Sequence, residues 1–263
     1  MNASSWNLPA SLRVEERGPV AVLTLSRAHK RNALDDATVQ GIGRFFDAVP
    51  ERARAVVIAA EGDHFSAGLD LGEMSEQGAV VGIHHSRMWH AVFAKIQGGG
   101  VPVIAVLKGA VVGGGLELAA AAHLRVAERS AFFGLPEASR GLFVGGGASV
   151  RVSRLVGVQR MTDMMLTGRV LDAEEGLRDG LVDYLVDEGQ GLDRALELTE
   201  RMAGNSPMST YAILHALPRI AEADPETGLL MESLMATVAQ STEEARERMN
   251  DFLAGRAAKV AQR

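Results

Sequence analysis

A run of glycines between two apolar segments constrains the fold of this sequence most. Three consecutive glycines, Gly113, Gly114 and Gly115, follow the apolar run Val103–Leu107 and precede an alanine-rich segment, residues 117–122. This order predicts a buried strand, a tight turn and the first turn of a buried helix. Because glycine has no Cβ atom, another group can approach this backbone closely. The free N–H groups at the helix start favour a negatively charged neighbour.

The first turn of that predicted helix carries a carboxylate, Glu117, inside an otherwise apolar segment. Burying a carboxylate without a partner is costly, so Glu117 is a candidate functional residue. A second candidate, Glu137, comes directly after another predicted strand, residues 131–135. Two carboxyl groups that face one cavity tend to ionise unequally, so that one serves as a base and the other as an acid. Spacing alone leaves a second interpretation open, in which Glu117 is a helix cap and Glu137 belongs to a surface loop.

The composition excludes several classes of protein. The chain has 263 residues, 47% of them hydrophobic, which is enough for one large domain or a main domain with an appendage. A net charge of −6 argues against a nucleic-acid partner, and the absence of cysteine excludes disulfides, thiolate metal sites and a cysteine nucleophile. No early segment has the features of an export signal, and no apolar run is long enough to span a membrane. We therefore expect a soluble, cytoplasmic protein.

Strands and helices alternate in the pattern up to Gly189. Capping-box spacing predicts helix starts at Asp70, with Glu73, and at Asp172, with Glu175. The weak pattern between Met74 and Gly82 predicts a mobile loop. Strands are expected at residues 12–16, 20–25, 55–60, 103–107, 124–127, 131–133 and 181–186, and helices through residues 39–49, 84–96, 117–122 and 150–156.

Beyond Gly189 the pattern predicts helices only. The pairs Ser206-Pro207 and Asp224-Pro225 each combine an N-cap with a proline at the first helical position, and Ser241 with Glu244 predicts a further helix start. The helix after Asp224 carries a wide apolar stripe, which we expect to pack on the rest of the chain or on another subunit. Its members are Leu229, Leu230, Leu234, Met235 and Val238.

Other familiar site patterns are absent. The glycine triplets at 113–115 and 145–147 match neither the dinucleotide fingerprint nor the phosphate loop. The histidines at 84, 85 and 90 lack the spacing of a metal-binding helix, so no metal site is predicted. No G-x-S-x-G elbow is present, which argues against an ordinary serine hydrolase. The segment 67–70 could supply backbone N–H groups to a site or merely begin a capped helix.

Taken together, the motifs resemble those of the crotonase superfamily, the enoyl-CoA hydratase/isomerase family. The resemblance runs from about residue 12 to the C-terminus. It implies an α/β fold, a crotonase-like spiral of ββα units over residues 1–195 that holds the active site, and a helical oligomerisation region over residues 196–263 that builds homotrimers or homohexamers. The motifs that carry it, in order, are Asn32-Ala33-Leu34, Phe65–Asp70, Gly109–Glu117, Leu135-Pro136-Glu137, and Leu166-Thr167-Gly168 before Ala173–Leu177.

The resemblance also implies roles for individual residues. In the family, two backbone N–H groups hold the oxygen of an acyl-CoA thioester, and they fall here on Leu69 and Gly114. The two glutamates of the family's hydratases fall on Glu117 and Glu137, and Gly145 matches a glycine that lines the water site. These matches imply an enoyl-CoA hydratase, a carbon–oxygen lyase that adds water to a short 2-enoyl-CoA and needs no cofactor, because coenzyme A is part of the substrate.

Contacts to the CoA portion carry over less completely. A basic loop, His29, Lys30 and Arg31, and the positions Ala67 and Asp70 match the part of the family's site that meets the nucleotide. Near the C-terminus, Phe252 matches an aromatic residue that reaches a neighbouring subunit's CoA. Gly255 stands where a lysine is usual, and Arg256 or Lys259 could replace it. Two further departures near the acyl pocket are Leu69, where alanine is common, and Val144, where proline is common.

Within the family, residues 86–90, 141–147 and 229–237 look most like the methylthioacryloyl-CoA hydratases, which act on a short sulfur-bearing enoyl-CoA. Three alternatives remain: a thioester hydrolase with Glu137 as its base, an enoyl-CoA isomerase, and a non-catalytic acyl-CoA-binding protein. The presence of both glutamates favours the hydratase, since isomerases usually manage with one and degenerate members usually lose one.

Overall fold

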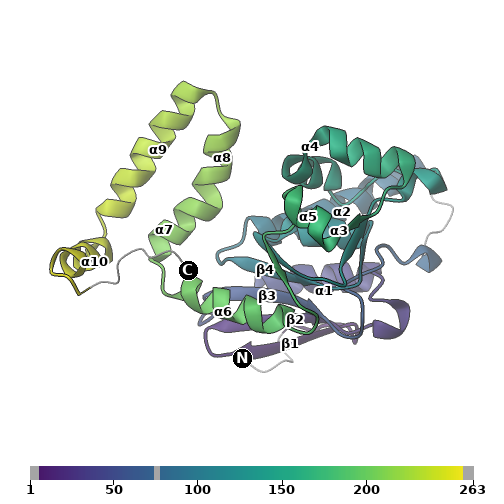
Figure 1. The fold of residues 1–263 in the computed structure, drawn as a ribbon, viewed down its shortest axis with the longest axis horizontal. Helices are drawn as coiled ribbons and strands as arrows, with labels where there is room; N and C mark the ends of the chain where they lie inside the picture. Colours follow the sequence, from purple (N-terminus) through teal and green to yellow (C-terminus); the bar gives the residue numbers. More distant parts are fainter. Residues whose placement is uncertain (1–5, 74–77, 257–263) are drawn as a thin grey trace. The chain divides into compact units, whose positions relative to one another are not determined.

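The computed structural model describes residues 6–73 and 78–256 of the chain (Figure 1). Two compact units divide after Ala203. The first unit is α/β and the second contains helices. The predicted boundary between residues 195 and 196 falls inside helix α6 (Gly191–Ala203), which packs against strands of the first unit.

Two sheets form the framework of the first unit. The larger has the strand order β1-β2-β3-β4-β6-β9, in which β1 and β2 are an antiparallel hairpin and the other neighbours are parallel. The smaller has the order β5-β7-β8. The strands are β1 (Leu12–Arg17), β2 (Val20–Leu25), β3 (Ala55–Ala60), β4 (Val103–Leu107), β5 (Ala110–Val112), β6 (Leu124–Glu128), β7 (Phe132–Gly134), β8 (Leu171–Asp172) and β9 (Tyr184–Val186).

The elements repeat as ββα units. In β4-β5-α3 and again in β6-β7-α4, the first strand joins the larger sheet and the second joins the smaller one. An earlier repeat follows the same path, because β3 leads to Ser66, which bridges to Val111 of β5, and then to α2. The chain therefore winds repeatedly between the two sheets, which confirms the predicted α/β spiral.

Both faces of the larger sheet are covered. Val57 of β3 faces a cluster with Ala195 and Leu198 of α6, whereas its neighbours Val56 and Ile58 belong to the main core on the other face. Successive side chains of a strand point to opposite faces. A strand buried on both faces is therefore apolar throughout, as residues 55–60 are.

The helices of the first unit agree with the pattern except at α2. This helix begins at Ala79 and not near His84, because Gly78 accepts the first N–H groups and starts it early. Val80, Val81 and Ile83 are exposed in that first part, so no buried apolar stripe marks it in the sequence. The helices are α1 (Asp36–Asp47), α2 (Ala79–Gln97), α3 (Gly114–Ala121), α4 (Ala148–Thr167), α5 (Ala173–Arg178) and α6.

Two other local predictions need correction. The strand expected over residues 181–186 is limited to β9, because the N–H groups of Leu181 and Val182 both bind Gly176 O and form a turn. The described residues after Asp70 form a 3-10 turn, Leu71–Glu73, whose Gly72 N donates to Asp70 Oδ1. Of the loop expected between Met74 and Gly82, residues 74–77 lie outside the described residues and residues 79–82 are helical. The capping box of Asp172 and Glu175 is confirmed.

The second unit consists of α7 (Pro207–Tyr211), a π-helical turn (Ala212–Ala216), α8 (Leu217–Glu222), α9 (Pro225–Gln240) and α10 (Glu243–Leu253). Asp224 caps α9 as predicted, but Thr242, and not Ser241, caps α10 by accepting from Ala245 N. The apolar stripe of α9 is exposed, so its packing partner stays a prediction. Among the described residues, no helix has the length and hydrophobicity needed to cross a membrane.

Candidate active site

Strand β5 brings three distant segments of the chain to one place. Val112, its last residue, pairs with Gly134 of β7 on one side. On the other side, Ser66 N donates to Ala110 O at 2.9 Å and Ser66 O accepts from Val112 N at 3.0 Å. All three segments run in parallel. The residues that follow them, including Leu69, Glu117 and Glu137, therefore emerge at the same edge.

The glycine triplet has no room for side chains. A Cβ atom on Gly113 would lie 2.9 Å from Glu137 Oε1, and one on Gly115 would lie 2.5 Å from Ser66 O. A Cβ atom on Gly114 would lie 2.9 Å from the ring of Trp89. Gly113 also has a φ of +53°, which side chains disfavour. These contacts confirm that the glycines permit close approach to the backbone.

Two backbone amides beside this triplet are free to bind an oxygen atom. Gly114 begins α3, where N–H groups lack an intrahelical acceptor. Leu69 lies between two bonds that join its neighbours to Leu34, namely Leu34 N to Gly68 O and Asp70 N to Leu34 O. The structure gives neither amide an acceptor among the described residues. A Cβ atom on Gly114 would lie 3.3 Å from Leu69 N, so the two amides are close together.

Glu117 is buried, with 4% of its surface exposed, on the first turn of α3. Its Oε1 atom accepts hydrogen bonds from Gly146 N at 2.7 Å and from Ala148 N at 3.0 Å. Burial raises the pKa of this carboxyl group, while those two N–H groups and the charges of His90 and Arg151 act in the opposite direction. Hydrogen bonds to a carboxylate favour its ionised form.

Glu137 begins a 3-10 turn, Glu137–Arg140, directly after β7. Its Oε2 atom is buried and has no hydrogen-bond partner among the described residues. Burial raises the pKa of this group most, its own backbone amide acts against burial, and the charge of Glu117 raises the pKa further, against a smaller effect of Arg140. The charge of Glu117 thus favours the neutral form of Glu137, whereas two N–H groups from another segment favour the ionised form of Glu117.

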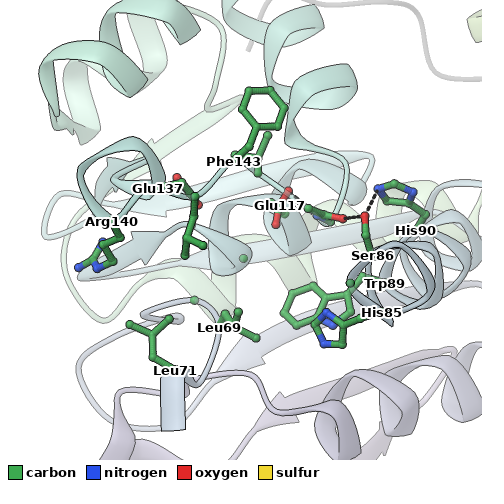
Figure 2. A pocket seen from close by; sticks show the side chains of 18 of the residues that line it. Leu69, Leu71, His85, Ser86, Trp89, His90, Glu117, Glu137, Arg140 and Phe143 are labelled. Atoms are coloured by element: carbon green, nitrogen blue, oxygen red, sulfur yellow. Dashed lines mark hydrogen bonds between the residues drawn. The ribbon is translucent and has the colours of Figure 1, made fainter. Parts of the chain in front are cut away.

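Both carboxyl groups face one cavity of about 690 Å³ (Figure 2). Its walls are largely apolar and include Leu69, Leu71 and Trp89. The Trp89 ring lies between His85 and Phe93 and closes the wall beside Gly114. The sequence had not indicated Trp89 as a site residue, although its spacing of four from Phe93 is that of one buried helix face.

The predicted CoA-binding residues are divided between the cavity and its surroundings. Ala67, Leu69, Gly114 and Gly145 line the cavity. His29, Lys30, Arg31 and Asp70 do not. The basic loop nevertheless lies beside this segment, since Arg31 O accepts from Ala67 N at 2.9 Å.

Asp70 is fixed by charges of the chain itself. Its Oδ2 atom lies 3.0 Å from Lys30 Nζ and 2.8 Å from Arg27 Nη1. The bond from Lys30 lowers the pKa of this group most, followed by the N–H of Gly72. Asp70 therefore connects the basic loop to the segment that carries Leu69.

In the second unit, Phe252 is exposed and Arg256 pairs with Asp251, while Lys259 lies outside the described residues. Among residues 6–73 and 78–256, no group of three or more His, Asp or Glu side chains is placed to hold a metal ion.

Comparison with known proteins agrees with this geometry. The profile of the Enoyl-CoA hydratase/isomerase family matches residues 15–263. The chain is 31% identical over 243 residues to a short-chain-enoyl-CoA hydratase of Clostridium acetobutylicum, covering 91% of this chain and 93% of the relative. It is 32% identical over 246 residues to a 2,3-dehydroadipyl-CoA hydratase of Escherichia coli, covering 93% and 96%.

A crystal structure from Rhodopseudomonas palustris, of a protein provisionally assigned as an enoyl-CoA hydratase, is 58% identical to this chain. The two superpose with a TM-score of 0.93 over 96% of this chain and 98% of the other. The fold is thus that of a crotonase-type enzyme. The chain belongs to the enoyl-CoA hydratase/isomerase family.

Proposed function

We propose that the protein is an enoyl-CoA hydratase that adds water to the double bond of a short-chain 2-enoyl-CoA. One observation carries this proposal: the buried Glu117 and the half-buried Glu137, without ion-pair partners among the described residues, share a cavity with two unpaired backbone amides. The amides suit the thioester, and the carboxyl groups suit the water. The hydratase names of the relatives support the same reaction.

The amides of Leu69 and Gly114 bind the thioester oxygen in this proposal. As water adds to the β-carbon, the electrons of the double bond move towards that oxygen and form an enolate. The two N–H groups stabilise the negative charge that develops. Removing one such donor typically costs about 3–4 kcal/mol of barrier.

The two glutamates divide the proton transfers. Glu117, whose hydrogen bonds favour the ionised form, takes a proton from the water as its oxygen bonds to the β-carbon. Glu137, whose surroundings favour the neutral form, gives its proton to the α-carbon as the enolate collapses. One proton is taken up and one is released, so the reaction balances without a cofactor.

The walls of the cavity support a small apolar acyl group. Trp89 and Leu69 line the cavity beside the amides, and leucine at position 69, where the family commonly has alanine, adds volume at that point. The short-chain preference named for the Clostridium relative is consistent with this shape. A compact substrate such as 3-methylthioacryloyl-CoA is the particular candidate.

Two further parts of the proposal concern coenzyme A and assembly. The exposed loop His29–Arg31 supplies cations beside the cavity for the nucleotide phosphates, and Phe252 with Arg256 or Lys259 supplies contacts to the CoA of a neighbouring subunit. The exposed stripe of α9 supports association of the second unit into a homotrimer or homohexamer, since exposed apolar patches commonly mark interfaces. We expect the enzyme to act in the cytoplasm.

The test is an acyl-CoA panel assayed by the loss of enoyl-CoA absorbance with purified protein. Hydration of a short 2-enoyl-CoA is expected, with 3-methylthioacryloyl-CoA included in the panel. Glu117→Gln and Glu137→Gln should each lower kcat by about 10²–10⁴-fold and keep CoA binding, measured by calorimetry.

The panel also separates the alternatives. Release of free thiol from a saturated acyl-CoA without hydration would assign a thioester hydrolase. Movement of the double bond would assign an isomerase, and binding without turnover a non-catalytic protein. Near-full hydration by either glutamine variant would contradict the assigned mechanism.

A further inference from the structure

The turn that holds Glu117 is itself held by two helices. The N–H groups of Gly146 and Ala148 point at Glu117, and both belong to the turn that leads into α4. Their direction depends on the peptide groups of this turn, because each N–H is fixed rigidly to the preceding carbonyl. Whatever binds those carbonyls therefore also sets the position of the carboxylate.

Ser86 of α2 binds the first of these carbonyls. Its Oγ atom donates to Gly145 O at 2.6 Å and lies 3.4 Å from His90 Nε2 (Figure 2). A hydroxyl group has one proton, which here goes to Gly145 O, so the contact with His90 requires a proton on Nε2. The peptide whose N–H is that of Gly146 is thereby tied to α2.

Arg151 of α4 binds the carbonyl of Gly146, the residue whose own N–H donates to Glu117. Its Nη1 atom donates to Gly146 O at 3.2 Å, and its Nε atom donates to Gln97 Oε1 at 3.0 Å. Arg151 is partly buried and forms no ion pair among the described residues. Burial lowers the pKa of its guanidinium group, and the charge of Glu117 raises it. Arg151 has no ion-pair partner of its own among the described residues. Its charge therefore favours the ionised form of Glu117, the carboxylate that Gly146 N–H binds.

We propose, on the basis of the function proposed above, that Ser86 is a positioning residue that aims Gly146 N–H at Glu117, and that Arg151, bonded to the carbonyl of the same glycine, stabilises the ionised form of that carboxylate. The other titratable groups that face Glu117 are His90 on α2 and Glu137 after β7. Helix α3 carries no other charged residue.

The electrostatic part has a definite sign. Arg151 opposes the effect of burial on Glu117, so removing its charge raises the pKa of Glu117 further. The rising limb of the pH–rate profile, which follows ionisation of the base, then moves to higher pH. Because the residue does not touch the substrate, kcat falls, by about 10²-fold or less, and KM changes little.

The experiment compares Arg151→Gln with Arg151→Lys and with Arg160→Gln. Arg160 lies in the part of α4 beyond the kink at Gly157 and pairs with Asp163 and Asp179, so its loss removes an equal charge away from the cavity. Two quantities are measured: the pH–rate profile of hydration, and the titration of the Glu117 carboxyl carbon by ¹³C NMR, assigned with Glu117→Gln. Thermal unfolding checks that each variant is folded.

A higher pKa of Glu117 and a shifted limb in Arg151→Gln, partly restored by lysine and absent in Arg160→Gln, would support the proposal. An unchanged titration in Arg151→Gln, or an equal change in Arg160→Gln, would overturn it. If Arg151→Gln does not fold, Ser86→Ala is measured in its place. A raised pKa of Glu117 in that variant would support the proposal, and an unchanged pKa would overturn it. A wild-type protein without hydratase activity would end the proposed function, while the NMR titration would still decide the role of Arg151.

Discussion

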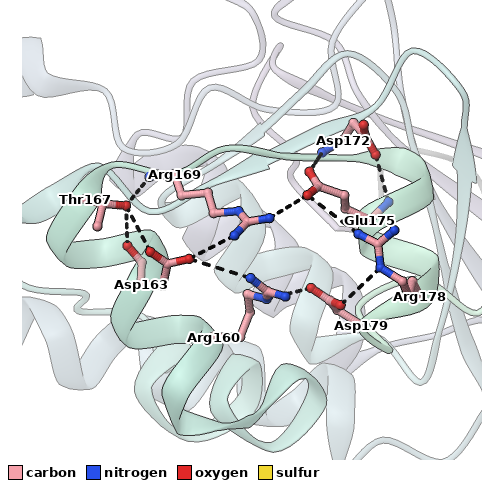
Figure 3. A network of polar contacts seen from close by, with 8 residues as sticks. All are labelled: Arg160, Asp163, Thr167, Arg169, Asp172, Glu175, Arg178 and Asp179. Atoms are coloured by element: carbon pink, nitrogen blue, oxygen red, sulfur yellow. Dashed lines mark hydrogen bonds and ion pairs between the residues drawn. The ribbon is translucent and has the colours of Figure 1, made fainter.

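Carboxyl groups lie in opposite surroundings in two regions of the first unit. In the cavity, Glu117 and Glu137 are shielded from water without an ion-pair partner among the described residues, and the pKa of each is raised. In a network of charges on α4, β8 and α5, Glu175 lies 2.6 Å from Arg169 Nη2, and that bond lowers its pKa (Figure 3). The same kind of side chain thus has its pKa shifted upwards in one region and downwards in the other.

The carboxylates of this network contribute to the stability of the fold. Arginines and acidic residues alternate there across neighbouring elements, and each arginine pairs with two carboxylates. Exposed pairs of this kind each contribute little, so the network stabilises mainly by linking α4 to α5. The members are Arg160, Asp163, Arg169, Glu175, Arg178 and Asp179. A carboxyl group that must exchange protons lacks such partners, and one that joins helices has them.

Neutralising one carboxyl group in each region should separate the two roles most clearly. Glu137→Gln is expected to lower kcat by about 10²–10⁴-fold, because the proton donor is lost. Glu175→Gln should leave kcat unchanged and lower the unfolding temperature slightly, because it loses the ion pair with Arg169, while its amide oxygen can still accept from Asp172 N. Initial rates and thermal unfolding measure both effects. Equal losses of activity would contradict the division.

Adding a methyl group in each region tests packing. A Cβ atom on Gly146 would lie 2.8 Å from Glu117 Oε2, so Gly146→Ala should cost about 1–3 kcal/mol of stability and most of the activity. Gly168, beside the network, has open space but a φ of +73°, so Gly168→Ala should cost about 1–2 kcal/mol through the backbone and leave activity intact. Urea unfolding and initial rates distinguish the two. An active Gly146→Ala enzyme would show that the carboxylate can move.

The pH dependence of stability should have opposite signs in the two regions. Because folding raises the pKa of Glu117, its contribution to stability is fully present below the unfolded value of 4.5 and is lost as pH rises through the folded pKa. Folding lowers the pKa of Glu175, so its contribution is present above 4.5 and is lost as pH falls through the folded value. Unfolding curves measured from pH 3 to 8 check this. The free energy of unfolding should depend less on pH above 4.5 in Glu117→Gln, and less on pH below 4.5 in Glu175→Gln.

Salt should affect the network alone, and only slightly. At an ionic strength of about 1 M the Debye length falls to about 3 Å, which screens exposed pairs but not buried groups. We expect the wild-type unfolding temperature to fall by a few degrees at most, and a variant without Arg169 to respond less. The pH–rate profile, set by the buried carboxyl groups, should keep its position. A profile that moves with salt would mean that solvent ions reach Glu117.

The sequence predicted those parts of the site that depend on local order. Glu117 was identified because a carboxylate stood alone in an alanine-rich segment, and the glycines before it marked a close approach. The strands of the larger sheet were found because continuous apolar runs such as residues 55–60 and 103–107 indicate a buried strand even when the neighbouring strands are unknown. Glu137 was identified because it directly follows a predicted strand, and the order of the motifs shared with the family then added Leu69 and Gly114.

Contacts between distant segments could not be predicted in the same way. Nothing near Ser86 or Arg151 indicates that both bind the turn after Gly145, because that depends on how α2 packs beside α4. The early start of α2 was missed because Val80 and Val81 are exposed, so the buried periodicity begins later than the helix. Asp70 was interpreted as a helix start from its spacing to Glu73. Its ion pairs with Arg27 and Lys30 could not be predicted, because those residues come from another part of the chain.

The parallel alignment of Ser66, β5 and β7 makes the exact number of residues in these segments as important as their identity. Leu69, Gly114 and Glu137 each follow their strand by a fixed, small number of positions. Side chains alternate along a strand, so one inserted or deleted residue turns the following side chains to the other face. A length change near residues 112–113 or 134–136 would thus keep every functional side chain and still separate them, whereas the exposed tip of the β1–β2 hairpin at Gly18 could vary in length with little effect on the site.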